Sequence, residues 1–277
     1  MQQRTLAAPF TVEGVGIHTG VVSRVTAHPA DTDTGRVFQT GRVLIPARAE
    51  YVVDTARCTT LGSEGARIST VEHLLSALMG FSIDNALIVV EGPEIPILDG
   101  SALPFVEAIR SAGVREQTRA PRVLTLEAPL ELHAGNGSIR AMPAASTLEL
   151  EVTTDFADWR EGDATLTAYL EPEDAEAYAA HIAPARTFAF QQEVDALLAA
   201  GLAKGGSLDN ALIITPPDGF SRPLRLPSEW CAHKMLDLLG DLALTDRRLQ
   251  IHVAAIRPGH TLNTRFAAAL LAQSPPR

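Results

Sequence analysis

The most regular hydrophobic pattern of the chain lies between residues 228 and 242. Apolar side chains recur there at the three- and four-residue spacing of a helix, at Trp230, Met235, Leu236, Leu238, Leu239 and Leu242. Pro227 marks a break just before this run, and Ser228 has the side chain of a helix N-cap. The pattern therefore predicts an amphipathic helix that is half buried.

Two polar residues interrupt the apolar stripe of this helix. His233 and Asp237 stand four residues apart, so their side chains share one face, and Asp241 follows one turn later. A buried imidazole or carboxylate needs a partner, and a divalent metal ion is one that such a pair can bind together. A solvated His–Asp pair on the outer face is the alternative, and for an isolated motif it is the commoner case.

Other parts of the chain show the periods of strands and shorter helices. Strands are expected within residues 11–27, around 37–39, and at 42–46, 86–90, 123–126, 138–142, 148–153, 211–214 and 249–256. Helices are expected at 69–80, 103–112, 185–198 and from about residue 261. Ser69 and Glu72 have the spacing of a capping box, and residues 171–181 fit either a surface helix or a polar loop.

One spacing occurs twice. His73 is followed seven residues later by Gly80 and then by a strand, and His233 is followed in the same way by Gly240 and a strand. We therefore expect an α+β fold of two similar domains, residues 1–113 and 123–277, joined by a charged linker. Each domain would be a two-layer sandwich of sheet and helices, with the active site between the two.

Composition narrows the function classes. Hydrophobic residues make up 46% of the 277 residues, which is enough for a full core. The two cysteines, Cys58 and Cys231, give no disulfide framework and indicate a reducing cytoplasm. A net charge of -10 argues against broad nucleic-acid binding, which needs a basic surface. Without a signal-peptide pattern, a membrane span or a spare apolar stripe, the chain is expected to be a cytoplasmic monomer.

Two histidines and one aspartate are candidates for a metal site between the halves. His73 comes from the first half, and His233 and Asp237 come from the second. Catalytic zinc keeps three protein ligands and an open position for water, whose pKa the metal lowers toward neutrality. The chain has eight histidines, so spacing alone leaves this set as one option among several.

The neighbours of these residues offer acid–base groups. Glu72, beside the first of the histidines, is a candidate general base that takes a proton from water. His260, in a turn after a strand, is a candidate proton donor to a leaving amine, and Asp241 would orient His260 and raise its pKa. Lys234 and Thr187 are candidates to stabilise an oxyanion.

Several short motifs occur in an order that points to one enzyme family. They are residues 3–5, 14–20, 68–74 (Ile-Ser-Thr-Val-Glu-His-Leu), 93–97, 99–101, 185–188 (Ala-Arg-Thr-Phe), 205–207, 233–241 and 259–263. Together they run through nearly the whole chain, which resembles the UDP-3-O-acyl-N-acetylglucosamine deacetylases, the zinc amidases of lipid A synthesis. No single motif is specific, but their number and order are.

The resemblance implies a fold of two similar α+β layers with the metal between them. It implies a Zn²⁺ ion held by His73, His233 and Asp237. It makes Glu72 the general base, His260 the general acid and Asp241 the residue that orients His260. Thr187 and Lys234 would stabilise the oxyanion.

The resemblance also implies the substrate contacts. Cys58 matches a cysteine near the metal, and His18 and Phe188 match positions in the substrate site. Residues 189–214 correspond to an insert that forms a passage for the acyl chain. Arg257 falls where a basic residue contacts the nucleotide or the sugar.

The expected reaction removes the N-acetyl group from UDP-3-O-acyl-N-acetylglucosamine, with water as second substrate and acetate as a product. Two alternatives stay open at this point. A metal-dependent deacetylase of this kind could act on another acylated amino sugar, and the rim of the site would distinguish the two substrates. A non-catalytic relic that only binds ligand would have lost site residues, whereas all the expected ones are present.

Overall fold

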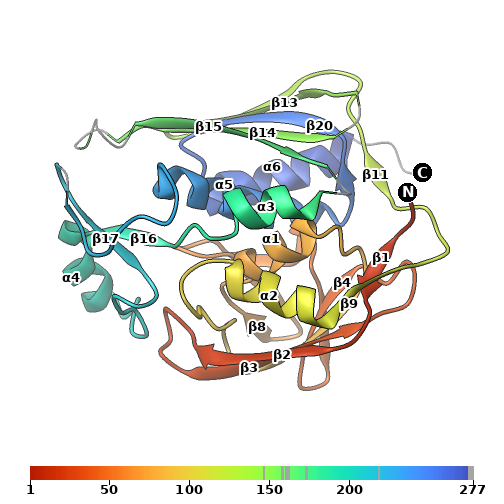
Figure 1. Ribbon diagram of the computed structural model, residues 1–277, viewed down its shortest axis with the longest axis horizontal. Helices are drawn as coiled ribbons and strands as arrows, with labels where there is room; N and C mark the ends of the chain where they lie inside the picture. Colours follow the sequence, from red (N-terminus) through yellow and green to blue (C-terminus); the bar gives the residue numbers. More distant parts are fainter. Residues whose placement is uncertain (146, 157–158, 160–162, 172–173, 218, 274–277) are drawn as a thin grey trace.

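The computed structural model describes residues 1–145, 147–156, 159, 163–171, 174–217 and 219–273. Two five-stranded sheets form the outer layers, and helices from both halves of the chain fill the space between them (Figure 1). The N-terminal sheet has the order β2 (Phe10–Val15), β3 (Val22–Pro29), β9 (Ala86–Glu91), β4 (Arg36–Thr40) and β5 (Val43–Pro46). Alternating burial along these strands turns one apolar face toward the helices.

The C-terminal sheet repeats this topology. Its order is β12 (Leu130–Ala134), β13 (Gly137–Pro143), β20 (Ile251–Ile256), β14 (Leu148–Thr154) and β15 (Ala164–Leu170). In both sheets the central strand comes last in sequence, and it runs parallel to one neighbour and antiparallel to the other. The predicted α+β class and the internal repeat are therefore confirmed.

The helices between the sheets also follow the repeat. α1 (Glu72–Gly80) precedes β9 and α2 (Leu103–Ala112) follows it, while α5 (Glu229–Leu242) precedes β20 and α6 (His260–Gln273) follows it. The two further helices are α3 (Ala175–His181) and α4 (Gln191–Ala199), and short 3-10 turns lie at Ala49–Tyr51 and Ala243–Thr245. α1 and α5 are central to the molecule and are buried along almost their whole lengths.

Smaller sheets complete the structure. In the N-terminal half they are β1 (Arg4–Leu6) with β10 (Val114–Glu116), and β6 (Val52–Asp54) with β7 (Thr60–Ser63) and β8 (Ala66–Ile68). β11 (Val123–Leu124) pairs with β19 (Arg248–Leu249), and β16 (Phe188–Phe190) pairs with β17 (Leu212–Thr215), which pairs with β18 (Gly219–Phe220). Among the described residues, no helix combines the length and the apolar character needed to cross a membrane.

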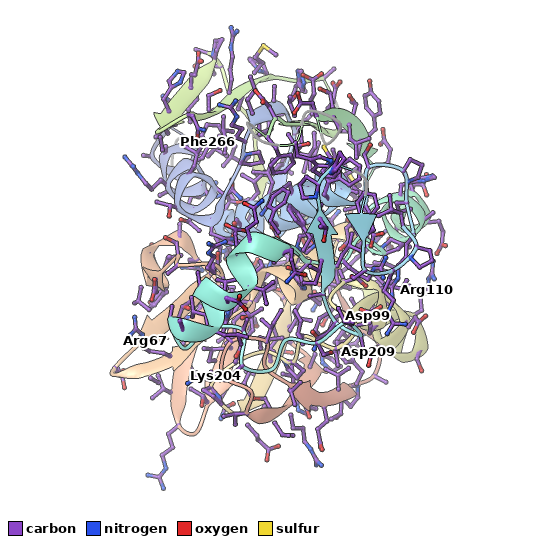
Figure 2. The ribbon with its side chains drawn as sticks, turned by 90° about the vertical axis from the view of Figure 1, so that its left-hand side faces the viewer. Arg67, Asp99, Arg110, Lys204, Asp209 and Phe266 are labelled. Carbon is purple, nitrogen blue, oxygen red and sulfur yellow. The ribbon has the colours of Figure 1, made fainter. Side chains whose placement is uncertain are left out.

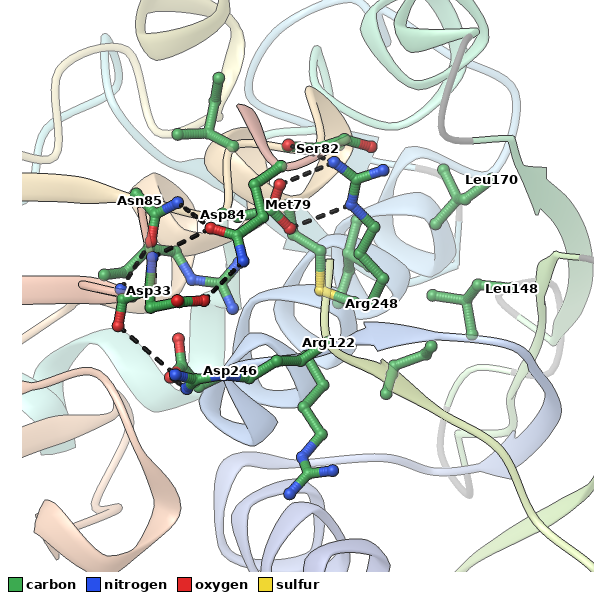
Figure 3. A pocket seen from close by; sticks show the side chains of 18 of the residues that line it. Asp33, Met79, Ser82, Asp84, Asn85, Arg122, Leu148, Leu170, Asp246 and Arg248 are labelled. Atoms are coloured by element: carbon green, nitrogen blue, oxygen red, sulfur yellow. Dashed lines mark hydrogen bonds and ion pairs between the residues drawn. The ribbon is translucent and has the colours of Figure 1, made fainter. Parts of the chain in front are cut away.

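Ion pairs and polar contacts join the two halves around a small cavity. Figure 3 shows Arg248, next to the C-terminal sheet, directed at Asp84 of the N-terminal half. The guanidinium donates to both carboxylate oxygens of Asp84, at 3.0 and 2.6 Å. Such a bidentate pair fixes orientation as well as distance. The interface is therefore held by directed contacts in addition to apolar packing.

Two local expectations are wrong. Ser69 and Glu72 form no capping box, because α1 begins at Glu72 and the Glu72 carboxylate accepts from the Thr59 amide instead. Residues 185–190 are not helical, because Phe188–Phe190 pair with β17 and the helix begins only at Gln191. Of the two alternatives for residues 171–181, the surface helix is correct at Ala175–His181, and α3 also packs inward through Tyr178, whose ring is fully buried and whose hydroxyl bonds Ser76 of α1.

The close approach of α1 and α5 depends on one glycine. A Cβ atom at Gly240 would lie 2.1 Å from the carbonyl oxygen of Glu72 and 2.8 Å from its carbonyl carbon. Both atoms belong to backbone, so they cannot move aside without shifting a helix. A side chain at this position would therefore separate the two helices.

We expect Gly240→Ala to lower the free energy of unfolding by about 1–3 kcal/mol, because the added methyl overpacks the α1–α5 contact. Thermal unfolding of the purified variant measures this as a fall in Tm. Gly259→Ala is the matched control, since a Cβ there meets no atom within 4 Å. Equal Tm values for the two variants would contradict the proposed tight contact.

Candidate active site

The contact of α1 with α5 brings three predicted metal ligands together. His73 lies in the first turn of α1, and His233 and Asp237 lie one turn apart on α5. The Nε2 atoms of His73 and His233 are 3.7 and 3.4 Å from the Oδ1 atom of Asp237. One ligand atom from each residue lies within 4.8 Å of the others, and all three side chains are buried.

The atoms behind these ligands hold their orientation. His233 Nδ1 lies 3.1 Å from the carbonyl oxygen of Ala185, which leaves Nε2 to face the cluster. Lys234 Nζ donates to Asp237 Oδ2 at 3.0 Å, so that Oδ1 remains for the cluster. His73 Nδ1 is buried without a hydrogen-bond partner among the described residues.

The protonation states of the cluster suit a cation. Burial lowers the pKa of His73 to about 3, with a further contribution from the neighbouring His233, and burial also lowers the pKa of His233. Burial alone would raise the pKa of Asp237, but His233, Lys234 and the other two histidines lower it. Two neutral imidazoles and one carboxylate are the forms that bind a metal ion. The described structure could therefore hold a metal at this point.

Glu72 and His260 form an acid–base pair beside the cluster. The Glu72 Oε1 atom is 3.9 Å from His260 Nε2, and its Oε2 atom accepts from the Thr59 amide at 3.0 Å. His260 Nδ1 lies 2.9 Å from Asp241 Oδ2. That carboxylate also accepts from Asn263 at 3.0 Å and from the Thr59 hydroxyl, so it is fixed on three sides.

The two groups have displaced pKa values for different reasons. Burial raises the pKa of Glu72 to about 8, and the nearby charges of Asp241 and Asp237 add to this effect. Burial would lower the pKa of His260, but Asp241 and Glu72 outweigh it and raise the value to about 9. At neutral pH these pKa values leave Glu72 largely protonated and His260 charged, and a cation bound at the cluster would favour the Glu72 carboxylate that accepts a proton.

These residues line a polar cavity of about 260 Å³, which we call the catalytic cavity. Besides the His–His–Asp cluster, Glu72 and His260, its walls include Lys234, Thr187 and Phe188. Lys234 Nζ lies 5.5 Å from the centroid of the Phe188 ring. The structure therefore brings eight of the twelve predicted site residues into one cavity, and Asp241 stands directly behind His260.

A second, largely apolar cavity of about 290 Å³ adjoins the first, and we call it the apolar cavity. Five residues line both cavities: Arg57, Glu72, His73, Thr187 and Phe188. The insert at 189–214 supplies much of the remaining wall, through residues such as Val194, Leu197 and Ile213. His18 lines this cavity from the N-terminal half.

Two predicted substrate contacts lie apart from the cavity walls. Cys58 is 6% exposed, and burial, with Glu72 nearby, raises the pKa of its thiol to about 12, so it is an unreactive neutral group. The Arg257 guanidinium bonds the Asp155 side chain and donates to the carbonyl oxygens of Asp155 and Asn136. Neither residue lines the catalytic or the apolar cavity, and their substrate roles stay predictions.

The sequence did not predict a role for Glu94, whose carboxylate holds the turn that carries His18. Its buried carboxylate accepts from the amides of His18 and Thr19 at 3.0 and 2.8 Å and from the Thr70 hydroxyl at 2.9 Å. Gly16 leaves room for it, because a Cβ there would lie 2.2 Å from Glu94 Oε2. Two glycines flanking His18 were the signal for a constrained turn, but nothing local indicated the carboxylate, which is 76 residues away.

The chain is similar to known proteins along nearly its whole length. The sequence signature of the UDP-3-O-acyl N-acetylglycosamine deacetylase family matches residues 3–272. Proteins named UDP-3-O-acyl-N-acetylglucosamine deacetylase from Anaeromyxobacter sp. (strain Fw109-5) and from Nitratidesulfovibrio vulgaris are 41% and 40% identical, each over 98% of this chain and 88% of the relative. A protein of the same name from Thermosynechococcus vestitus is 40% identical over 98% of this chain and 94% of its own length. With this agreement along its whole length, the chain belongs to the UDP-3-O-acyl N-acetylglycosamine deacetylase family.

Proposed function

We propose that this enzyme hydrolyses the N-acetyl group of UDP-3-O-acyl-N-acetylglucosamine to give UDP-3-O-acyl-glucosamine and acetate, a step of lipid A synthesis. One observation carries the proposal: a buried His–His–Asp cluster shares a cavity with a carboxylate of raised pKa and an imidazole of raised pKa. A metal-dependent amide hydrolase uses these groups together, and the apolar cavity beside them suits the acyl chain. Water is the second substrate, and we expect a monomer that works in the cytoplasm.

We propose Zn²⁺ as the cofactor, held by His73, His233 and Asp237. Two imidazole nitrogens and a carboxylate oxygen fit the ligand set of a catalytic zinc that keeps an open position. The bound ion would lower the pKa of a water molecule and polarise the amide carbonyl. The buried Nε2 atoms of His73 and His233 lie 3.7 and 3.4 Å from Asp237 Oδ1, farther than a normal hydrogen bond, so a cation between them would give these atoms the partner that they need at this depth.

Glu72 acts as the general base in this proposal. Its carboxylate takes a proton from the attacking water, and its raised pKa lets it hold that proton near neutral pH. The Thr59 amide bonds Oε2 at 3.0 Å, which leaves Oε1 to receive the proton.

His260 acts as the general acid. Its Nδ1 is tied to Asp241, so Nε2 is the atom that gives a proton to the departing amine. Glu72 Oε1 lies 3.9 Å from that nitrogen, close enough for the two groups to act on one amide bond. Asp241 keeps the imidazole protonated and oriented until the carbon–nitrogen bond breaks.

Thr187 and Lys234 stabilise the negative charge that develops on the amide oxygen. Both line the catalytic cavity, and the Thr187 amide is fixed by a 2.7 Å hydrogen bond to the carbonyl of Gly100. Lys234 Nζ also bonds Asp237, so its charge stays beside the metal ligands. Donors that are already in place need no reorganisation during the reaction.

The apolar cavity supports the acyl assignment. His18 and Phe188 line it together with the insert at 189–214, and burial of a fatty acyl chain there is favourable at about 0.8 kcal/mol for each methylene group. We assign the 3-O-acyl chain to this cavity and the sugar to the catalytic cavity. Another acylated amino sugar with the same chain is the alternative substrate, and a direct comparison of acetate release separates the two.

Glu72→Gln is expected to reduce acetate release by about 10²–10⁴-fold, because the amide side chain cannot accept the proton from water. The metal content of the variant should equal that of the wild type, since Glu72 is not among the ligands. Elemental analysis and an acetate assay on the same sample check both statements. Wild-type turnover in this variant would remove Glu72 from the mechanism.

His233→Ala is expected to release the metal, because only two of the three protein ligands remain. Metal per chain, measured after gel filtration, should fall well below that of the wild type. His181→Ala is the matched control, since His181 lies in the last turn of α3, outside the catalytic cavity. Unchanged metal in His233→Ala would overturn the ligand assignment.

The pH dependence of kcat/KM reports the protonation state of His260. The acid form is needed, so kcat/KM should fall as the pH rises through the His260 pKa, which Asp241 and Glu72 raise to about 9 in the metal-free protein. A bound cation lowers this pKa, so the falling limb is expected at or below that value. Asp241→Asn should shift the limb to lower pH. An unshifted limb would show that another group controls it.

A further inference from the structure

Arg57 stands on the wall that the catalytic cavity and the apolar cavity share. Among the five shared residues it is the one permanent cation. Its φ of +67° is a left-handed conformation that is uncommon outside glycine. The preceding Ala56 amide bonds the Asp54 carboxylate at 3.0 Å, which fixes the turn, and about half of the Arg57 side chain is exposed. The backbone thus holds a guanidinium where the two cavities meet.

α4 forms part of the wall of the apolar cavity. Val194, Leu197 and Leu198 line the cavity from this helix. None of the residues of α4 is buried, so little apolar packing holds the helix in place. In Figure 1, α4 lies with β16 and β17 at one end of the molecule, outside the two large sheets. A wall of this kind needs other contacts to keep its position.

Three polar contacts fasten α4 and the residues after it to the N-terminal half. The amides of Lys204 and Gly205 donate to the carbonyl oxygens of His18 and Ile17, at 3.3 and 3.0 Å. Figure 2 shows Lys204 just beyond the end of α4, against the N-terminal strands. Nearer the start of the helix, Glu193 Oε1 lies 3.3 Å from Arg57 Nη2. Within the described part of the chain, this ion pair is the one polar contact from an α4 side chain to the N-terminal half.

We propose that the Arg57–Glu193 ion pair is a specificity determinant that favours long acyl chains by holding α4 over the apolar cavity. The inference rests on the proposed function, because it takes this cavity as the acyl site. When α4 is already ordered over the cavity, the binding free energy of the substrate is not reduced by the free energy of ordering the helix. A long chain that contacts Val194 and Leu197 gains from this order, whereas a short 3-O-acyl group does not reach the helix. Arg57 and Glu193 are therefore positioning residues that act through α4.

The test uses two substrates that differ only in the 3-O-acyl group, one with a fatty acyl chain and one with an acetyl group. In Glu193→Gln, we expect KM for the fatty acyl substrate to rise about two- to five-fold, the range that an exposed ion pair supports. We expect kcat for that substrate, and both constants for the acetyl substrate, to stay at wild-type values. Asp195→Asn is the matched control, because it removes the same charge from α4 at a residue whose side chain makes no hydrogen bond or ion pair with the described part of the chain.

A salt series on the wild type gives an independent measurement that needs no variant to fold. Raising the ionic strength to about 1 M shortens the Debye length to about 3 Å and weakens an exposed pair. KM for the fatty acyl substrate should then rise toward the Glu193→Gln value in the wild type and stay nearly constant in Glu193→Gln.

The outcomes separate the inference from the function that it rests on. Two results together would overturn the role of the ion pair alone. Both substrates would be turned over with equal KM values in Glu193→Gln and Asp195→Asn, and wild type and Glu193→Gln would show the same salt response. Failure of the metal-loaded wild type to release acetate from either substrate would overturn the proposed function and this inference together. A rise in KM confined to the fatty acyl substrate supports both.

Discussion

The close contact between α1 and α5 is the constraint on which the rest of the structure depends. Gly240 permits the approach, because its missing side chain leaves room for the carbonyl of Glu72. The same contact puts His73 beside His233 and Asp237, residues that come from the two halves of a repeated fold. Neither half alone carries all three residues of the His–His–Asp cluster. Assembly of the two halves and formation of the site are therefore one event.

Burial at this interface also sets the chemistry. Desolvation keeps the two ligand imidazoles neutral and raises the pKa of Glu72, while Asp241 keeps His260 charged in spite of its burial. Groups with opposite shifts within a few ångströms are typical of sites that move protons. The polar network around Asp241, with Thr59 and Asn263, offsets the cost of a buried carboxylate. The site is thus a product of packing as much as of residue identity.

Much of this arrangement could be predicted from sequence, because its signals are local. The apolar stripe of α5, the helix at Leu103–Ala112 and the repeated His–Gly spacing all lie within short windows. The failures depend on partners outside these windows: Phe188–Phe190 form a strand because β17 pairs with them, and no capping box forms because the Glu72 carboxylate accepts from the Thr59 amide. Arg57 carried no local signal at all, since its importance comes from the position of Glu193, 136 residues away.

The central claim is that a metal ion held by the buried His–His–Asp cluster makes this protein a deacetylase. The most direct measurement determines metal per chain in the purified protein and follows acetate release from UDP-3-O-acyl-N-acetylglucosamine before and after treatment with a chelator. We expect about one zinc ion per chain, as for a single three-ligand catalytic site, with release that is lost with the metal and returns when zinc is added back. Undiminished release from the metal-free protein would contradict the central claim.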